Sequence, residues 1–221
     1  MAYSKNFLAN FSASIEVLDV SLSELSNSLE KYVTQTEYQF AISSPYSEAT
    51  TITIRFLNSH IPHLLGLSRD HHIGLQTYHS ETIFENLKHN EEWNLKSLKA
   101  GDESWFDECK DKVIGCFYLY QMMNNLQTQY YNTTPFQGPK NHRILKRIER
   151  DNVTYIMIKN EKGISYSLEF TENNSESGVF FPRSLKINDP VEDYLVPITL
   201  SPVNAVRIKK QKKSTKRKKR K

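Results

Sequence analysis

Two histidines that could move protons stand three residues apart in the first third of the chain. His60 and His63 lie in the segment His60-Ile61-Pro62-His63-Leu64-Leu65-Gly66. Histidine titrates near neutral pH, so it can accept or donate a proton during catalysis. A histidine in such a place can instead cap a strand end by bonding a backbone carbonyl. We therefore treat His63 as a candidate acid or base and His60 as a candidate substrate contact.

The residues before the two histidines predict the element that holds them. In residues 50–56 threonine and arginine alternate with isoleucine and phenylalanine, which is the pattern of a strand with one polar and one apolar face. Residues 37–43 alternate in the same way, so residues 37–56 predict an antiparallel hairpin. Pro62 and Gly66 then indicate a short turn at the strand end. A loop fixed by a rigid strand is a suitable place for a catalytic group.

A second candidate segment lies much later in the chain, after a short aromatic stretch. Here Arg183, Ser184 and Lys186 stand almost side by side. An arginine can bind a phosphate with two parallel hydrogen bonds, and a serine hydroxyl can donate to another phosphate oxygen. The alternative is an ordinary strand edge, on which arginine and lysine prevent aggregation.

A metal site is an alternative use of the histidines, because five of the seven fall within 20 residues. Their spacing matches no standard site, and no paired carboxylate motif accompanies them. The chain also has no glycine-rich phosphate loop, no HExxH motif and no CxxC pair. We therefore expect no metal and no cofactor. The five histidines are His60, His63, His71, His72 and His79.

The net charge of +4 conceals an acidic body with a basic tail. Residues 207–221 carry 11 of the 29 Lys and Arg residues and no acid, which leaves 18 basic against 25 acidic residues in the rest. Self-repulsion should keep residues 209–221 disordered. Such a tail can hold a polyanion, or it can be a solubilising end or a nuclear-import signal. Its candidate contacts are Lys209, Lys210, Lys212, Lys213, Lys216, Arg217, Lys218, Lys219, Arg220 and Lys221.

Helical patterns dominate the first part of the chain and strand patterns the second. Apolar spacing predicts helices over about residues 15–34, 80–90 and 102–123, and Cys109 and Cys116 fall on the apolar stripe of the last one. Residues 153–159 and 164–170 predict a strand hairpin. No apolar run is long enough for a membrane helix. This order of elements predicts an α+β fold, with helices packed on a small antiparallel sheet.

The two candidate segments together resemble a known family. An apolar-His-Leu-x-Gly turn after a hairpin, here Ile61-Pro62-His63-Leu64-Leu65-Gly66, is similar to the phage-borne nuclease-like domains of the barnase–EndoU–colicin–RelE (BECR) superfamily. The later part of the resemblance is a Pro-x-Ser turn, here Pro182-Arg183-Ser184, and a strand containing Tyr194. The resemblance covers about residues 37–210.

The resemblance implies a compact α+β nuclease that cleaves RNA without a metal, by attack of the ribose 2′-hydroxyl on the adjacent phosphate. His63 would then be the acid or base, and Arg183 and Ser184 would hold the phosphate. Arg55 or Lys186 would supply further positive charge. Tyr166 or Tyr194 would stack on a base.

These interpretations give a domain plan and two functional alternatives. The plan is an N-terminal helical segment (1–36), a BECR-like nuclease domain (37–208) and the basic tail (209–221). The first alternative is a cytoplasmic ribonuclease of phage or mobile-element origin, acting as a toxin or effector, with RNA or DNA as ligand and an antitoxin or immunity protein as partner. The second is a non-catalytic module that binds nucleic acid through its tail and a protein through its body.

Overall fold

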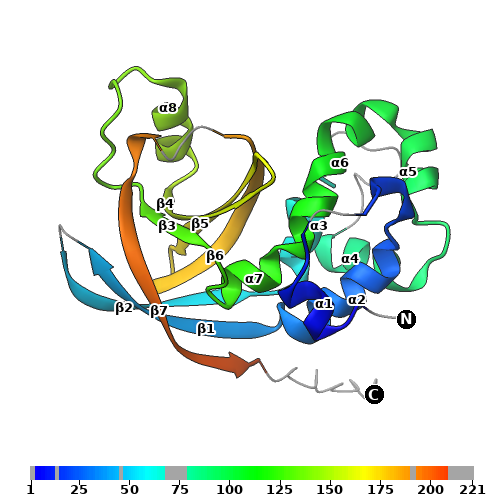
Figure 1. Cartoon of the computed structure of the whole chain (residues 1–221), viewed down its shortest axis with the longest axis horizontal. Helices are drawn as coiled ribbons and strands as arrows, with labels where there is room; N and C mark the ends of the chain where they lie inside the picture. Colours follow the sequence, from blue (N-terminus) through cyan, green and yellow to red (C-terminus); the bar gives the residue numbers. More distant parts are fainter. Residues whose placement is uncertain (1–2, 13–14, 45–46, 68–78, 190–192, 209–221) are drawn as a thin grey trace, which may run out of the picture.

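A barrel of strands and a layer of helices beside it make up the protein (Figure 1). The computed structural model describes residues 3–12, 15–44, 47–67, 79–189 and 193–208. Neighbouring strands follow the order β1-β2-β6-β5-β4-β3-β7, and the sheet closes where β7 pairs with β1. The strands are β1 (Thr36–Ser44), β2 (Ser47–Phe56), β3 (Gln129–Asn132), β4 (Val153–Glu161), β5 (Ile164–Asn173), β6 (Glu176–Ile187) and β7 (Val196–Arg207).

The closed barrel corrects the predicted fold class. We expected helices on a small antiparallel sheet, and that expectation is wrong, because seven described strands form a continuous closed sheet. One of its contacts is parallel, between Thr53 and Val179 and between Ile54 and Phe180. The predicted hairpins 37–56 and 153–170 are present as β1–β2 and β4–β5. The prediction failed for the strand pairs that join one hairpin to the next and close the barrel.

Local sequence patterns conceal the strands that close the barrel. β3 is not among the strands that the sequence predicted, and it pairs with both β4 and β7. β6 and β7 each continue through a proline, at Pro182 and Pro202, where the pairing register shifts. Proline is tolerated in strands at such bulges. The sequence pattern therefore did not predict β6 and β7 as long continuous strands.

The helices gather on one side of the barrel, except for α8, which lies over its far end (Figure 1). Ser21 caps α2 by accepting a hydrogen bond from the Glu24 amide, so this helix begins later than the predicted residue 15. Asp102 caps α6 through the Trp105 amide, at the predicted start of the helix over residues 102–123. The helices are α1 (Lys5–Ala9), η1 (Val17–Asp19), α2 (Leu22–Tyr32), η2 (Asn58–His60), α3 (Ile61–Leu64), α4 (Ser80–His89), α5 (Leu95–Gly101), α6 (Glu103–Phe117), α7 (Leu119–Met123) and α8 (Arg143–Arg150).

Two hydrophobic clusters hold the two faces of the sheet. The larger cluster joins the helical layer to the strands and includes Met157 of β4. The smaller one joins Ile144 and Ile148 of α8 to Ile156 and Ile158 of the same strand. Alternate residues of a strand point to opposite faces, so α8 covers the face opposite the main helical layer.

The ends of the chain add little to this description. The predicted tail (209–221) lies outside the described residues, so its predicted disorder stays a prediction, as does the division of the chain at residues 36 and 208. Among the described helices, none is long and apolar enough to cross a membrane.

Candidate functional site

His63 is held by a tight two-part turn at the end of β2. The 3-10 turn η2 leads directly into α3, and Pro62 stands in the first turn of α3, where a missing amide hydrogen costs nothing. Gly66 ends the turn with a φ of +77°, and a Cβ at this position would lie 2.4 Å from the Cys109 sulfur of α6. Glycine therefore allows the turn to lie against α6, and His63 stays exposed at its tip.

Arg183 is positioned by a bulge in β6. Across the strand pair, Glu169 faces Ser184 and the next residue, Phe170, faces Pro182, so Arg183 is the extra residue. We expected a turn at Pro182-Arg183-Ser184, and that expectation is wrong, because all three residues lie within a strand. A bulge redirects the side chain of its extra residue. The Arg183 side chain is accordingly 43% exposed.

The turn and the bulge meet at one cavity, which we call the catalytic-candidate cavity. Its volume is about 730 Å³. It brings together four of the residues that the sequence singled out, His63, Arg183, Ser184 and Lys186. The other lining residues come mainly from α6 and the end of α8: Gly66, Asp102, Ser104, Trp105, Glu108, Cys109, Lys112, Arg150 and Asp151.

One acidic residue, Asp151, contacts both arginines that line this cavity. Asp151 accepts a hydrogen bond of 2.9 Å from the Nε of Arg150 and lies 3.5 Å from the nearer terminal nitrogen of Arg183. The hydrogen bond from Arg150 and the charge of Arg183 lower the pKa of Asp151. Arg183 is thus oriented by a long, partly solvated contact and keeps donors that a ligand can use.

His63 and Lys186, which line this cavity, both have depressed pKa values. Partial burial lowers the pKa of His63 from its ordinary value, and the positive charges of Arg183, Lys112 and Lys186 lower it further. A hydrogen bond with the Arg183 backbone acts in the opposite direction. Burial also lowers the pKa of Lys186. A neutral imidazole beside several cations can accept a proton at neutral pH.

A second cavity, of about 740 Å³, opens beside the first and we call it the α8 cavity. The two share Glu108, Lys112, Arg150 and Lys186. The α8 cavity has six cationic and two acidic lining residues. The six cations are Lys112, Arg143, Lys146, Arg147, Arg150 and Lys186.

Below the α8 cavity, Arg147 holds the helix to the sheet. Its guanidinium bonds the buried carboxylate of Glu169 on β5, and its other terminal nitrogen lies 2.5 Å from Asp189. Burial raises the pKa of Glu169, against the lowering effect of Arg147. This ion pair fixes α8 in place beside Lys186.

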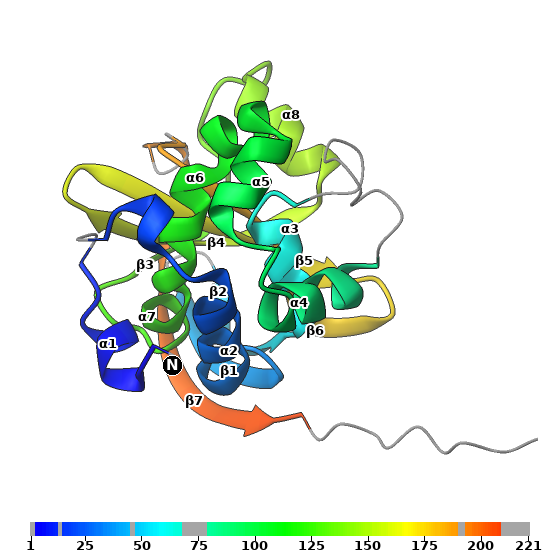
Figure 2. The ribbon, with the colours of Figure 1, turned by 90° about the vertical axis from the view of Figure 1, so that its right-hand side faces the viewer.

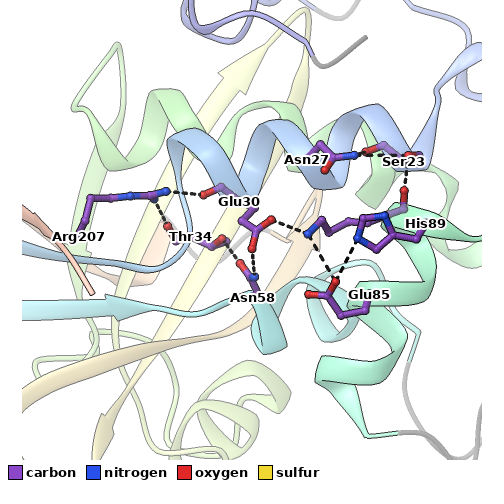
Figure 3. A network of polar contacts seen from close by, with 9 residues as sticks. Ser23, Asn27, Glu30, Thr34, Asn58, Glu85, His89 and Arg207 are labelled. Carbon is purple, nitrogen blue, oxygen red and sulfur yellow. Dashed lines mark hydrogen bonds and ion pairs between the residues drawn. The ribbon is translucent and has the colours of Figure 1, made fainter. Parts of the chain in front are cut away.

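A polar network on the opposite side of the His turn fixes its base (Figure 3). We call it the support network. The Asn58 amide donates to Glu30 at 2.9 Å, and the Asn58 oxygen accepts from the Thr34 hydroxyl. Glu30 also pairs with Lys88 of α4 at 2.6 Å. Arg207, at the end of β7, donates to the backbone oxygens of Thr34 and Glu30. Strand, turn and helix are thereby joined at the residues just before His60.

His60 and Arg55, both candidate substrate contacts, lie outside the residues that line the catalytic-candidate cavity. The Nδ1 of His60 accepts a hydrogen bond of 3.0 Å from the Leu57 amide, so His60 caps the backbone through an amide and not through the carbonyl that the structural alternative expected. Burial lowers the His60 pKa to about 4. Arg55 is paired with Glu37 and Glu176.

The two candidate tyrosines also lie outside the lining of this cavity. Tyr166 is 1% exposed and packs against Tyr118 in the core. Burial raises its pKa to about 12. Tyr194 packs between Phe136 and His142. A role for either ring in stacking on a base stays a prediction.

The alternative metal site is described only in part. Among the described residues no group of three or more His, Cys, Asp or Glu side chains could hold a metal ion. His71 and His72 lie outside the described residues. The ten basic residues of the tail do so as well.

Sequence reasoning missed most of the cations around the two cavities. Lys112 lies on α6, which we had interpreted only through its apolar stripe, and Lys146 and Arg150 lie on α8, which we had not recognised as a helix. The signal was present in residues 143–150, where Ile144 and Ile148 are four apart and the cations fall between them.

Comparisons with known proteins assign the chain to a family. The chain matched no curated protein and no solved structure. A family model described as phage-Barnase-EndoU-ColicinE5/D-RelE like nuclease4 matches residues 22–218, which include the whole barrel, both cavities and most of the helical layer. The match covers most of the chain, so this protein belongs to the phage-Barnase-EndoU-ColicinE5/D-RelE like nuclease4 (PBECR4) family, and its function is that of a nuclease in general.

Proposed function

We propose that this nuclease cleaves RNA without a metal ion, by attack of a ribose 2′-hydroxyl on the adjacent phosphate. The observation that carries the proposal is the meeting of His63, Arg183 and Lys186 at one cavity, although they come from segments far apart in the sequence. A proton acceptor beside several fixed cations is what this reaction requires.

The first step uses the neutral form of His63. Its imidazole accepts the proton of the 2′-hydroxyl while the 2′-oxygen forms a bond to phosphorus. The bond from phosphorus to the 5′-oxygen breaks, and that oxygen takes a proton from the Lys186 ammonium. The products end in a 2′,3′-cyclic phosphate and a 5′-hydroxyl. Proton exchange with water then restores both side chains.

The cations of the cavity stabilise the charge that develops on the phosphate. Arg183 at the bulge can form two parallel hydrogen bonds to phosphate oxygens. The Ser184 hydroxyl can donate to one of the same phosphate oxygens, and Lys112 adds positive charge from α6. Donors fixed in place before the reaction stabilise the transition state without having to reorganise.

A chimeric substrate tests the proposal directly. A DNA oligonucleotide with one internal ribonucleotide should be cut in EDTA at that position only, and the new end should be a 2′,3′-cyclic phosphate. The same strand with a 2′-O-methyl nucleotide should stay intact. Cleavage of the all-DNA strand, a free 3′-hydroxyl at the new end, or a requirement for divalent metal would contradict the proposal.

A further inference from the structure

The α8 cavity continues the catalytic-candidate cavity, and its residues Arg143, Lys146 and Arg147 have no part in the reaction proposed above. Lys112, Arg150 and Lys186 line both spaces, so a strand bound in one has a direct path into the other. Figure 2 shows α6 and α8 together toward one end of the molecule, away from α2 and α4.

The sequence of α8 separates its apolar side from its charged side. Ile144 and Ile148 are buried against β4 and Leu195. Arg143, Lys146 and Arg150 are exposed and line the cavity. Positions separated by three and four residues share a helix face, so the three cations form one stripe along the cavity.

The charges of α8 are used in two different ways. Arg147 is bound to Glu169 and Asp189 and holds the helix in place. Within the described part of the chain, Arg143 and Lys146 form no such ion pair, and the two acidic residues that line this cavity are Glu108 and Asp189. Arg143 and Lys146 therefore carry positive charge that the protein itself does not neutralise, whereas Arg150 is paired with Asp151. This local charge contrasts with the acidic balance of the chain before residue 207.

We propose that the α8 cavity is a subsite for the phosphates of an RNA strand next to the scissile phosphate, with Arg143 and Lys146 as its main contacts. The inference rests on the proposed function, since it names how that substrate extends beyond the reacting nucleotide. Arginine and lysine at a fixed spacing bind the backbone without reading the sequence. The subsite sets the preference of the enzyme for longer strands over dinucleotides.

The length of α8 suits a few phosphates. Arg143 and Arg150 are seven positions apart, which corresponds to roughly 10 Å along a helix. A stacked strand carries one phosphate per about 3.4 Å, so the stripe can face about three of them. Each phosphate contact releases counterions, and binding should therefore weaken as salt is added.

The test compares a double variant on α8 with a matched double variant elsewhere. Arg143→Gln/Lys146→Gln removes two exposed charges from the subsite, and glutamine is a good helix former. Lys5→Gln/Lys96→Gln removes two exposed lysines that line neither cavity. Circular dichroism checks the fold of both. Each is assayed on a dinucleotide, on a ten-nucleotide RNA, and for binding to a non-cleavable 2′-O-methyl decamer at several salt concentrations.

The α8 variant should lose about tenfold in kcat/KM on the decamer and keep the wild-type value on the dinucleotide. For decamer binding, the slope of log K against log salt concentration should fall in magnitude by about 1.4, since each lost phosphate contact contributes about 0.7. The control should match the wild type throughout.

An α8 variant indistinguishable from the control on the decamer would overturn the subsite and leave the proposed function intact. If the wild type cleaved neither substrate, the proposed function would fail. The salt slope for the non-cleavable decamer would then still decide whether α8 binds phosphates.

Discussion

The support network and the two cavities contain the same kinds of side chains and use them in opposite ways. In the support network Glu30 faces Lys88 and Asn58, and Glu85 faces Lys88, so opposite charges meet (Figure 3). In the α8 cavity six cationic residues stand with two acidic ones. The first region holds its own charges together. The second leaves positive charge for a ligand to neutralise.

This difference should separate effects on stability from effects on activity. A paired, half-buried network loses stability when one partner is removed, because the other partner stays desolvated. Like charges in a cluster repel one another. Removing one member therefore raises the stability of the fold and weakens the binding of an anionic ligand. The two histidines of the turn show the same contrast, since His60 caps the backbone and His63 faces the cavity.

The largest expected effect is on activity, from removal of the proton acceptor. His63→Ala should lower kcat on the chimeric strand by about 10²–10⁴-fold, the usual contribution of a positioned acid or base. For the wild type, activity should rise with pH through the His63 pKa, which lies below 6.5, and fall at high pH as Lys186 deprotonates.

A pH–rate profile from pH 4 to 10 checks this prediction. The residual activity of His63→Ala should lack the rise on the acid side. An unchanged acid limb in the variant would show that another group accepts the proton.

The second effect is on the pH dependence of stability and belongs to His60. Its pKa is 6.5 in an unfolded chain and about 4 in the fold. Above pH 6.5 both states are neutral at this position. As pH falls toward 4 the unfolded state takes up the proton first, so stability falls, by up to about 3 kcal/mol.

His60→Gln keeps a side chain that can accept the Leu57 hydrogen bond and removes the titration. Urea denaturation from pH 7 to 4 should therefore show a flatter loss of stability for the variant than for the wild type. Parallel curves for the two proteins would refute the assignment of His60 as a buried cap.

The third effect is a loss of stability without a loss of chemistry. Asn58→Ala removes one partner from both Glu30 and Thr34 and should lower the free energy of unfolding by about 1–3 kcal/mol. Chemical denaturation measures this loss. At a temperature where the variant is fully folded, kcat on the chimeric strand should equal that of the wild type; a large fall would place the network within the catalytic machinery.

The smallest effect has the opposite sign. Lys112→Gln relieves repulsion with Lys186 and should raise the free energy of unfolding by about 0.5–1 kcal/mol, while kcat/KM falls. Lys96→Gln on α5 is the control, since it is exposed and lines neither cavity. A variant that lost both stability and activity would show that Lys112 supports the fold.

The sequence was most informative where a residue and its neighbours decide the structure together. The hairpin before His63 and the helix that begins after Asp102 depend on contacts within a few residues, and both were predicted. The closure of the barrel depends on β3 and β7 meeting strands that are distant in the sequence, which no local pattern encodes.

The candidate site was predictable to a similar extent. His63, Arg183, Ser184 and Lys186 were singled out by residue type and now line one cavity. Arg55 and His60 have the same residue types but contact other parts of the protein. Arg55 forms ion pairs with Glu37 and Glu176, and His60 accepts a hydrogen bond from the Leu57 amide. Which arginine is paired and which faces a cavity depends on the tertiary fold, and so does the placement of Lys112 and Lys146.

The measurement that tests the central claim most directly is cleavage of total cellular RNA in EDTA by the wild type, His63→Ala and Arg183→Ala, with Lys96→Ala as the control. Circular dichroism establishes that each variant is folded. The account predicts that the wild type and the control cut the RNA and that the other two variants do not. Intact RNA at high wild-type concentration, or full activity in both variants, would contradict it.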